Sequence, residues 1–335
     1  MHSYNTKISI LEEDLEVLRN LETLLNQLRI DITSNIEYLK VKKNLGKLID
    51  FKFENEKIIL PLNPNEIREI VLLLKLSESI IKIQENSQFE KLVPHLRLLK
   101  KCYFFGRPLT DSKNTIWEEN TNKMFELFIA TGLLEIGFDL DIAKPTGNNG
   151  ERPDIYIRID DIRYGIECKV INSNIFKPYS FLKLIKKGTK QILKSEKIHL
   201  GFVFANIINI LPHDLLLPFD TTDSKQYCYC TVNEETIQTE IKSFLDSTNV
   251  SIKSYMEKHS MELKGIFISR KLIRMWLFYI VTVAFVKESD KVAVYFYQNI
   301  EATNIIDESN LDSEEDFKDF HRNKTLMEKI NKSLH

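Results

Sequence analysis

The sequence predicts an α/β chain of the α+β type, with a central mixed β-sheet flanked by helices and a mostly helical region before it. In residues 8–30, leucines recur every three or four positions, which gives the single apolar stripe of an amphipathic helix. From about residue 138 onward, short stretches of alternating apolar residues are interspersed with helical patterns, which is typical of strands and helices packed around a sheet. The 335 residues, 43% hydrophobic and 28% charged, are enough to bury a sizeable core.

The N-terminal region, residues 1–110, is predicted to be mostly helical. After the leucine-rich helix, a pair of short strands is expected within residues 48–62. The next helix is expected to begin with Asn63 as its N-cap and Pro64 at its first position, where each residue type is favoured. A further helix is expected over residues 88–101. No chemically reactive motif stands out in this region, so it is interpreted as a packing, dimerisation or partner-binding unit.

The second region, residues 111–300, alternates helices and strands. A cluster of turn-forming residues at 104–115 is the best candidate for the boundary before it. The expected elements are helix 116–136, strand 138–144, strand 154–159, strand 162–171, helix 179–196, strand 199–206, helix 234–259, strand 264–269, strand 276–286 and strand 291–298. Residues 301–335 are predicted to form an acidic linker and a C-terminal helix.

The composition narrows the class of protein. No run of about 18 uncharged apolar residues occurs, so neither a membrane span nor a membrane partner is expected. The first residues lack the basic and apolar segments of a signal peptide, and four cysteines in a chain of this length favour a reducing compartment. A cytoplasmic location is therefore expected. The net charge of −2 argues against a protein that coats nucleic acid.

The stretch "ERPDIYIRIDDIRYGIECKV", residues 151–170, predicts a β-hairpin with two chemically different faces. If Asp160 and Asp161 form a two-residue loop, the isoleucines and one tyrosine line a continuous apolar face. Under this register Asp154 lies directly opposite Glu167 on the other face. A longer loop with a shifted register is the alternative, because Asp-Asp is not the most favoured turn pair.

Two opposed carboxylates repel each other, because cross-strand Cβ atoms are only about 4.5–5.5 Å apart. A divalent cation such as Mg²⁺ would offset this cost by accepting one oxygen from Asp154 and one from Glu167. Lys169 points to the same side of the sheet, where its ammonium could orient or deprotonate a water. The alternative is that all three are solvated residues on the exposed face of a half-buried hairpin.

The flanking helices add a third carboxylate and a positively charged surface. Glu126 interrupts an apolar stretch of the helix before the hairpin, so it is expected to be buried and to need a partner, unless it reaches water at the helix edge. Residues 169–197 contain eight lysines against one acid, which favours a helix that holds a polyanion, although a solvated surface helix is the alternative. The residues expected to contact nucleic acid are Arg158, Arg163, Lys183, Lys186, Lys187, Lys190 and Lys194.

These motifs resemble the core of the PD-(D/E)XK nuclease superfamily, which has the restriction-endonuclease-like fold. Pro153-Asp154 resembles the "PD" of the superfamily, and Glu167-Cys168-Lys169 resembles its "(D/E)XK". Glu126 resembles the helix acid of many members. Gln191 resembles a glutamine of the exonuclease-like branch, although the tyrosine often found four residues later is a serine here. The resemblance covers roughly residues 112–210.

The resemblance implies a metal-dependent nuclease that hydrolyses phosphodiester bonds. Mg²⁺ or Mn²⁺ would be held by Asp154, Glu167 and the backbone carbonyl of Cys168, with help from Glu126. Lys169 would position the attacking water, and Gln191 would assist. The implied substrate is DNA, with RNA as the alternative.

The biological setting follows by analogy alone. The helical extension and the lack of any helicase motif favour a bacterial or phage restriction system for antiviral defence, with a protein partner that supplies target sensing or activation. The leucine stripe and the habit of the superfamily favour a homodimer. Two other hypotheses stay open: a catalytically inactive, nucleic-acid-binding member of the same fold, and a helical interaction protein whose hairpin charges are incidental.

Overall fold

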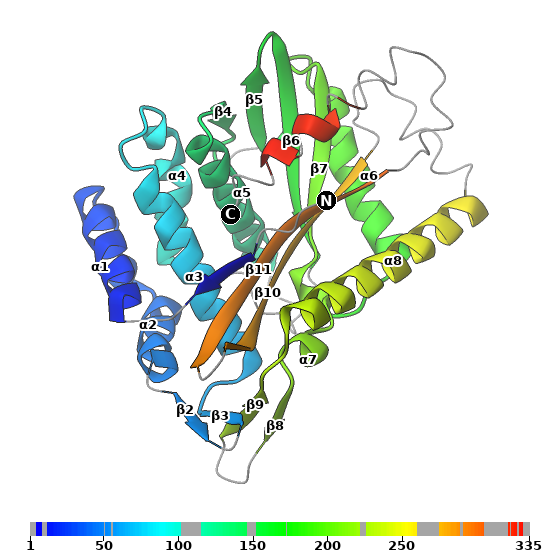
Figure 1. Cartoon of the computed structure of the whole chain (residues 1–335). Helices are drawn as coiled ribbons and strands as arrows, with labels where there is room; N and C mark the ends of the chain where they lie inside the picture. The colour runs from blue at the N-terminus through cyan, green and yellow to red at the C-terminus, as the bar shows by residue number, and fades with distance from the viewer. Residues whose placement is uncertain are drawn as a thin grey trace.

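The computed structural model has a mixed β-sheet between two groups of helices, with further helices at the N-terminal side (Figure 1). The structure describes residues 5–8, 12–49, 51–54, 56–101, 115–145, 152–171, 173–221, 226–259, 275–288, 291–304, 321, 323–326 and 328–330. The helices are α1 (Glu12–Gln27), α2 (Ile36–Ile49), α3 (Pro64–Lys82), α4 (Val93–Leu96), α5 (Thr115–Glu135), α6 (Pro178–Lys194), α7 (His213–Leu216) and α8 (Glu234–Lys258). The α+β class and the helical N-terminal region are therefore confirmed.

The main sheet has seven strands in the order β1-β11-β10-β7-β6-β5-β4. Its strands are β1 (Asn5–Ile8), β4 (Asp139–Ile142), β5 (Ile155–Ile159), β6 (Ile162–Val170), β7 (Leu200–Asn206), β10 (Met275–Glu288) and β11 (Lys291–Asn304). β7 pairs in parallel with both β6 and β10, and the other neighbours are antiparallel. The long hairpin β10–β11 and the shorter hairpin β5–β6 are thus joined through one central strand.

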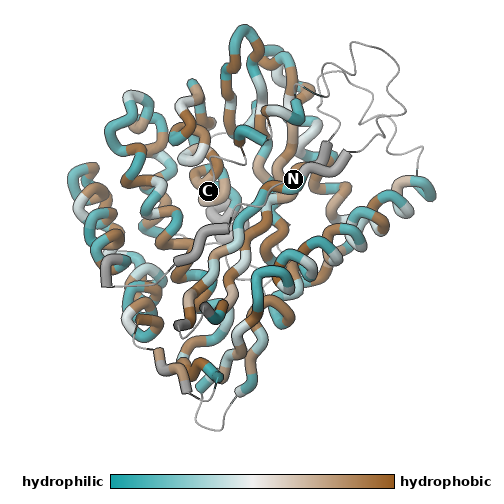
Figure 2. The backbone as a smooth tube through the Cα atoms, viewed as in Figure 1, coloured by the Kyte–Doolittle hydropathy of each residue, from teal (hydrophilic) through white to brown (hydrophobic). Residues whose placement is uncertain are grey.

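Both faces of the central strands of this sheet are buried, which explains their apolar character. Alternate side chains of β5 and β7 point to opposite faces, as the two-residue period of a strand requires. One face packs with α1, α3 and α5, and the other face packs with α6 and α8. Figure 2 shows the hydrophobic colour concentrated on the central strands and alternating with hydrophilic residues along α8.

A second, smaller sheet connects the N-terminal region to a segment after β7. Its four strands are β2 (Lys52–Glu54), β3 (Lys57–Leu60), β9 (Tyr227–Cys230) and β8 (Phe219–Thr221), in that order. The predicted strand pair within residues 48–62 is confirmed as β2–β3, but its pairing with β9 was not predicted. Together with β1, which pairs with β11, this sheet ties the first region to the second.

The N-terminal helix signals are accurate in one place and wrong in another. Asn63 accepts a hydrogen bond from the Glu66 backbone N–H, and the Glu66 carboxylate accepts one from the Asn63 N–H, so α3 begins with a capping box. The single helix expected over residues 88–101 is instead two 3₁₀ turns around the short α4. Pro94 lies at the start of α4 and has no N–H to continue a helical ladder from the preceding turn.

The remaining elements agree with the sequence pattern, except that β11 runs to Asn304, six residues beyond its predicted end. The strand predicted at 264–269 lies outside the described residues. Helical backbone at 323–326 and 328–330 agrees with the predicted C-terminal helix, and Leu326 and Ile330 are buried in the main core. None of the helices in the described part of the chain is long and apolar enough to cross a membrane.

Candidate active site

The β5–β6 hairpin has the register that its sequence predicts. Ile155 pairs with Ile166, Tyr156 with Gly165 and Ile159 with Ile162. The two-residue turn between the strands is made by the two aspartates, of which Asp160 has a positive φ of 52°. The predicted shifted alternative is therefore wrong. Because the register is fixed, the residues of the polar face lie where the alternation places them.

Asp154 and Lys169 form the centre of a buried charged cluster at the start of this hairpin. The carboxylate of Asp154 accepts a hydrogen bond of 3.0 Å from the backbone N–H of Cys168 on β6. The ammonium of Lys169 lies 3.4 Å from Asp154 Oδ2 and 3.3 Å from the carbonyl oxygen of Cys168, and it donates to the carboxylate of Glu167. The three oxygen donors that the sequence resemblance implies as metal ligands thus surround one cationic group.

Helix α5 completes the cluster from the side. Lys123 Nζ lies 2.6 Å from Glu126 Oε1 and 3.4 Å from Asp154 Oδ1, so it bridges the two carboxylates. The other oxygen of Glu126 lies 3.1 Å from Nε2 of His95, which is fully buried. Asn122, one residue before Lys123, accepts a hydrogen bond of 3.1 Å from the backbone N–H of Val170 and so ties α5 to the end of β6.

Burial gives these charges an unusually dry environment. The exposed fraction is 4% for Asp154, 0% for Glu167 and 1% for Glu126. Burial alone would raise the pKa of Asp154, but Lys169 and Lys123 outweigh it and hold that pKa below its usual value. The interpretation of the hairpin acids as exposed, solvated residues is therefore wrong.

The two lysines stay protonated because of the same contacts. Burial would lower the pKa of Lys169, but the neighbouring Asp154 and Glu167 reverse the effect and raise it. Burial would likewise lower the pKa of Lys123, and Glu126 and Asp154 raise it instead. With its ammonium held by carboxylates in this way, Lys169 is a hydrogen-bond donor and not a base.

The two glutamates carry the uncompensated part of the negative charge. Burial, and then the charge of Asp154, raise the pKa of both Glu126 and Glu167 well above the ordinary value. His95 gives no positive charge, because burial and the charge of Lys123 lower its pKa to about 3. Glu167 Oε1 is buried and receives no hydrogen bond among the described residues. A proton or an added cation would stabilise the cluster at this position.

The residues present fit a divalent cation in charge and in donor type. Two carboxylates and a backbone carbonyl converge on the ammonium of Lys169, and oxygen donors of this kind are the ligands that Mg²⁺ prefers. Among the described residues, however, no three His, Cys, Asp or Glu side chains are arranged to hold a metal ion. Lysine side chains hold the carboxylates here, so Lys169 would have to turn away to admit a cation.

Helix α6 covers Glu167 at very short range because it carries a glycine there. A Cβ atom on Gly188 would lie 3.0 Å from the side chain of Val203 and 3.3 Å from Cβ of Glu167. Gln191, one turn further along α6, is partly buried, and its Oε1 has no hydrogen-bond partner among the described residues. Gln191 is therefore on the helix that covers the site, but within the described residues its side chain makes no hydrogen bond to the carboxylates.

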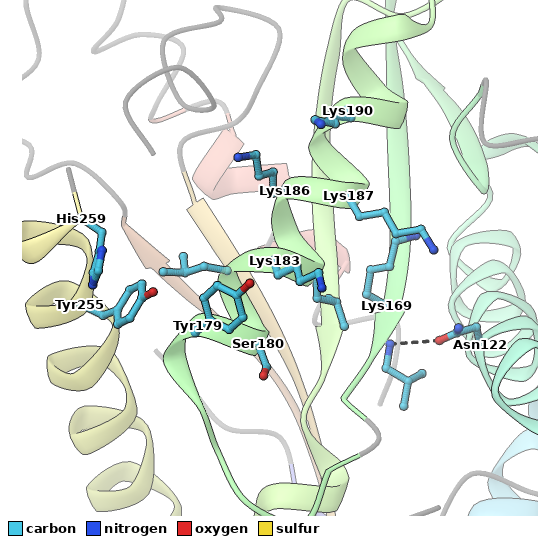
Figure 3. A pocket seen from close by; sticks show the side chains of 13 residues that line it. Asn122, Lys169, Tyr179, Ser180, Lys183, Lys186, Lys187, Lys190, Tyr255 and His259 are labelled. Carbon is cyan, nitrogen blue, oxygen red and sulfur yellow. Dashed lines mark hydrogen bonds between the residues drawn. The ribbon is translucent and has the colours of Figure 1, made fainter. Parts of the chain in front are cut away.

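An open cavity of about 690 Å³ adjoins the cluster, and Lys169 belongs to both (Figure 3). Four lysines of α6 line this cavity, and none of them has an ion-pair partner in the described part of the chain. They are Lys183, Lys186, Lys187 and Lys190. The polar side chain of Asn122 lies near Lys169, at the end of the cavity that adjoins the cluster. The basic helix predicted from the sequence thus faces the charged cluster across an accessible space.

Three of the residues expected to contact nucleic acid do not line this cavity. Arg158 and Arg163 are cross-strand partners near the hairpin turn, and the guanidinium of Arg163 lies 4.6 Å from the ring centre of Tyr156. Lys194 is exposed at the end of α6. The structure therefore brings together only part of the predicted basic set.

Sequence reasoning missed Lys123, His95 and Asn122. Lys123 had a usable signal, because it lies three residues before Glu126 on the same helix, where two side chains can pair. Asn122 and His95 had none, because their partners Val170 and Glu126 are distant in the sequence.

Comparisons with protein-family profiles, curated proteins and solved structures find no match for this chain. The resemblance to the nuclease superfamily therefore stays a prediction.

Proposed function

We propose that the protein is a metal-dependent nuclease that hydrolyses phosphodiester bonds of DNA. One observation carries the proposal: a buried cluster of three carboxylates and two lysines opens, through Lys169, onto a cavity lined by unpaired lysines. Such a cavity would hold a polyanion with one phosphate beside the cluster. The order α5, β4, β5, β6, α6, β7 supports a restriction-endonuclease-like core. A role in bacterial or phage antiviral defence is part of the proposal.

The residues of the cluster have distinct roles in this proposal. Asp154, Glu167 and the carbonyl of Cys168 would hold Mg²⁺ or Mn²⁺, with Glu126 in support. The ion would supply Lewis acidity and lower the pKa of water. Lys169, kept protonated by its acidic neighbours, would turn toward the cavity and donate hydrogen bonds to the phosphate as its charge grows. Lys123 would keep Glu126 and Asp154 in place.

The test is a cleavage assay on supercoiled plasmid and on linear single-stranded and double-stranded DNA, with Mg²⁺, Mn²⁺ or EDTA. We expect cleavage that requires the metal and falls at least about a hundredfold in Lys169→Ala, the usual scale for loss of one charge-stabilising donor. Lys82→Ala is the matched control, because Lys82 also pairs with a glutamate, Glu135, but at the surface. Equal activity of the two variants would remove Lys169 from the mechanism.

The second candidate is a nucleic-acid-binding protein of the same architecture that does not cleave. It is favoured by one observation: Lys123 and Lys169 already neutralise most of the carboxylate charge without a metal. Titration calorimetry with Mn²⁺ separates the two. Binding that disappears in Asp154→Asn supports the nuclease, whereas no binding together with no cleavage supports the second candidate.

A protein with incidental hairpin charges is the least supported hypothesis. Incidental charges are expected to be solvated, but Asp154 and Glu167 are buried and connected to two helices. If the charges were incidental, Asp154→Asn would leave stability, metal binding and DNA binding unchanged.

A further inference from the structure

Three aromatic rings lie together at the end of the cavity opposite Lys169. Tyr255 and His259, one turn apart at the end of α8, are stacked with ring centroids 4.3 Å apart and an interplanar angle of 22°. Tyr179, in the first turn of α6, lies with its ring centroid 6.4 Å from that of Tyr255. Figure 3 shows this group on one side of α6 and Lys169 on the other, with Lys183 between them.

Packing against the core accounts for only one of these three rings. Tyr179 is 59% exposed and His259 is also exposed, although Tyr255 is partly buried against the core. A large aromatic side chain that is more than half exposed on a cavity wall has ring surface available to a ligand. The two exposed rings therefore have room for a planar group beside them.

The charge of the same cavity defines the rest of the ligand. Among the described residues, five lysines and no acid line it, so a ligand that fills it is expected to carry several negative charges. Aromatic faces next to a row of cations suit a chain that alternates planar bases with phosphates. A phosphate-rich ligand without bases would use the lysines alone and leave the rings unexplained.

From this arrangement we infer that the cavity binds an unpaired nucleic-acid strand, with a base stacked on the aromatic group and the backbone along the lysines of α6. The aromatic group consists of Tyr179, Tyr255 and His259. In a duplex both faces of each interior base are covered by its neighbours, so these rings can stack only on an unpaired or terminal base. The inference deepens the proposed function by naming its substrate, which would be a single strand or an unpaired end. Only the cleavage that follows binding rests on the proposed function.

The experiment measures binding in EDTA, where cleavage cannot consume the probe. Fluorescence anisotropy would follow the full chain with labelled strands of about 12 nucleotides, within the site sizes of single-strand binding proteins. The probes are a DNA strand, the same strand with abasic sites, its duplex, and the RNA of the same sequence. The variants are Tyr179→Ala, Tyr255→Ala and Tyr255→Phe. Val250→Ala is the matched control, because Val250 is 68% exposed on α8 and does not line the cavity.

We expect the intact strand to bind about tenfold more tightly than the abasic strand and more tightly than the duplex. Tyr179→Ala and Tyr255→Ala should each remove most of that tenfold advantage, while Tyr255→Phe, which keeps the ring, and Val250→Ala should retain it. Tighter binding of RNA with the same dependence on bases and rings would support the inference with RNA as the ligand. Equal affinity for intact and abasic strands, or a preference for duplex that both alanine variants share, would overturn it.

These outcomes are independent of the nuclease proposal. Binding that depends on the rings, in a protein that cleaves nothing when Mg²⁺ or Mn²⁺ is added, would keep the inference and reject the proposed activity. Metal-dependent cleavage of duplex that Tyr179→Ala leaves intact, with no base-dependent binding, would keep the activity and reject the inference.

Discussion

Two sets of lysines lie within one region of this protein and have opposite surroundings. Lys123 and Lys169 are mostly buried between carboxylates, and each contacts two acidic side chains. The lysines of α6 in the cavity wall have no acidic partner within the described residues, and three of the four are exposed. The same residue type therefore fixes the geometry of the charged cluster in one place and leaves positive charge free in the other.

The difference shows which properties each set controls. Mostly buried pairs are screened little by solvent, so removal of one member leaves a charge without compensation and destabilises the fold. Exposed lysines contribute little to stability, but they attract a polyanion and make its binding depend on salt. Stability, metal response and pH dependence should follow the cluster, and salt dependence should follow α6.

The largest expected effect on stability is that of Asp154→Ala in the absence of metal. It removes a carboxylate shared by Lys123 and Lys169, so we expect the free energy of unfolding to fall by about 3–5 kcal/mol in urea denaturation. Asp139→Ala is the matched control. Asp139 also contacts a lysine, but its side chain is 67% exposed, and its loss should cost at most about 1 kcal/mol. Similar losses in the two variants would mean that the cluster is solvated.

A smaller effect, and one that metal should reverse, is expected for Lys123→Gln. The glutamine can still donate to Glu126, but the positive charge next to Asp154 is lost, which should cost about 1.5–3 kcal/mol in EDTA. Addition of Mn²⁺ should raise the Tm of this variant more than it raises that of the original protein, because the cluster now carries more negative charge. Lys82→Gln, at a surface pair, should show neither change. A metal response smaller than that of the unchanged protein would show that Lys123 positions Glu126 and Asp154 for the ion.

The pH dependence of stability tests the glutamates. Because the pKa of Glu167 is raised in the folded protein, its contribution to stability is present below the unfolded value, near 4.5, and is lost as pH rises through the raised value. The glutamine of Glu167→Gln cannot ionise. Above pH 4.5 in EDTA, the free energy of unfolding of this variant should therefore fall less steeply than that of the original protein. The difference should be up to about 1.4 kcal/mol for each pH unit over which Glu167 would lose its proton. Glu126 keeps its own raised pKa, so some of the slope should persist. If the free energy of unfolding has the same slope against pH from 5 to 9 in the variant and in the original protein, Glu167 is not an uncompensated charge.

Local patterns in the sequence predicted the hairpin and the first turn of α3. In the hairpin, a shift of one residue would have exchanged the two faces, so the apolar residues alone determine the pairing of Ile155 with Ile166. Asn63 and Pro64 mark a helix start through contacts within one turn. Pairing between strands that are distant in the sequence could not be predicted from local patterns. β1 and β9 are four residues each. β1 pairs with β11 and β9 pairs with β3, both far away in the sequence, so no local signal identifies these two partners.

The residues of the site also divide into those that a local pattern predicted and those that it did not. Alternation along β6 placed Glu167 and Lys169 on one face, and the register placed Asp154 near them. The burial of Glu126 was predicted from its apolar neighbours, but its partner His95 lies 31 residues earlier on another element. The aromatic group needed the fold as well, because α8 has to bring Tyr255 beside Tyr179 of α6. Contacts between elements depend on packing, and a pattern within one element does not contain them.

The smallest expected effect on stability, within about 0.5 kcal/mol, is that of the double variant Lys186→Ala, Lys187→Ala. Neither side chain has an ion-pair or hydrogen-bond partner in the described part of the chain, so none is lost. The effect of this double variant on binding should be clear: the slope of log affinity for a single strand against log salt should decrease in magnitude by about 1.4, or about 0.7 for each lysine. Lys194→Ala, Lys197→Ala removes the same charge from two lysines of the basic stretch that do not line the cavity, and should leave the slope near its original value. Equal slopes for the two double variants would mean that the strand follows the outer surface of α6. A smaller slope for Lys186→Ala, Lys187→Ala alone would place the strand in the cavity beside Lys169.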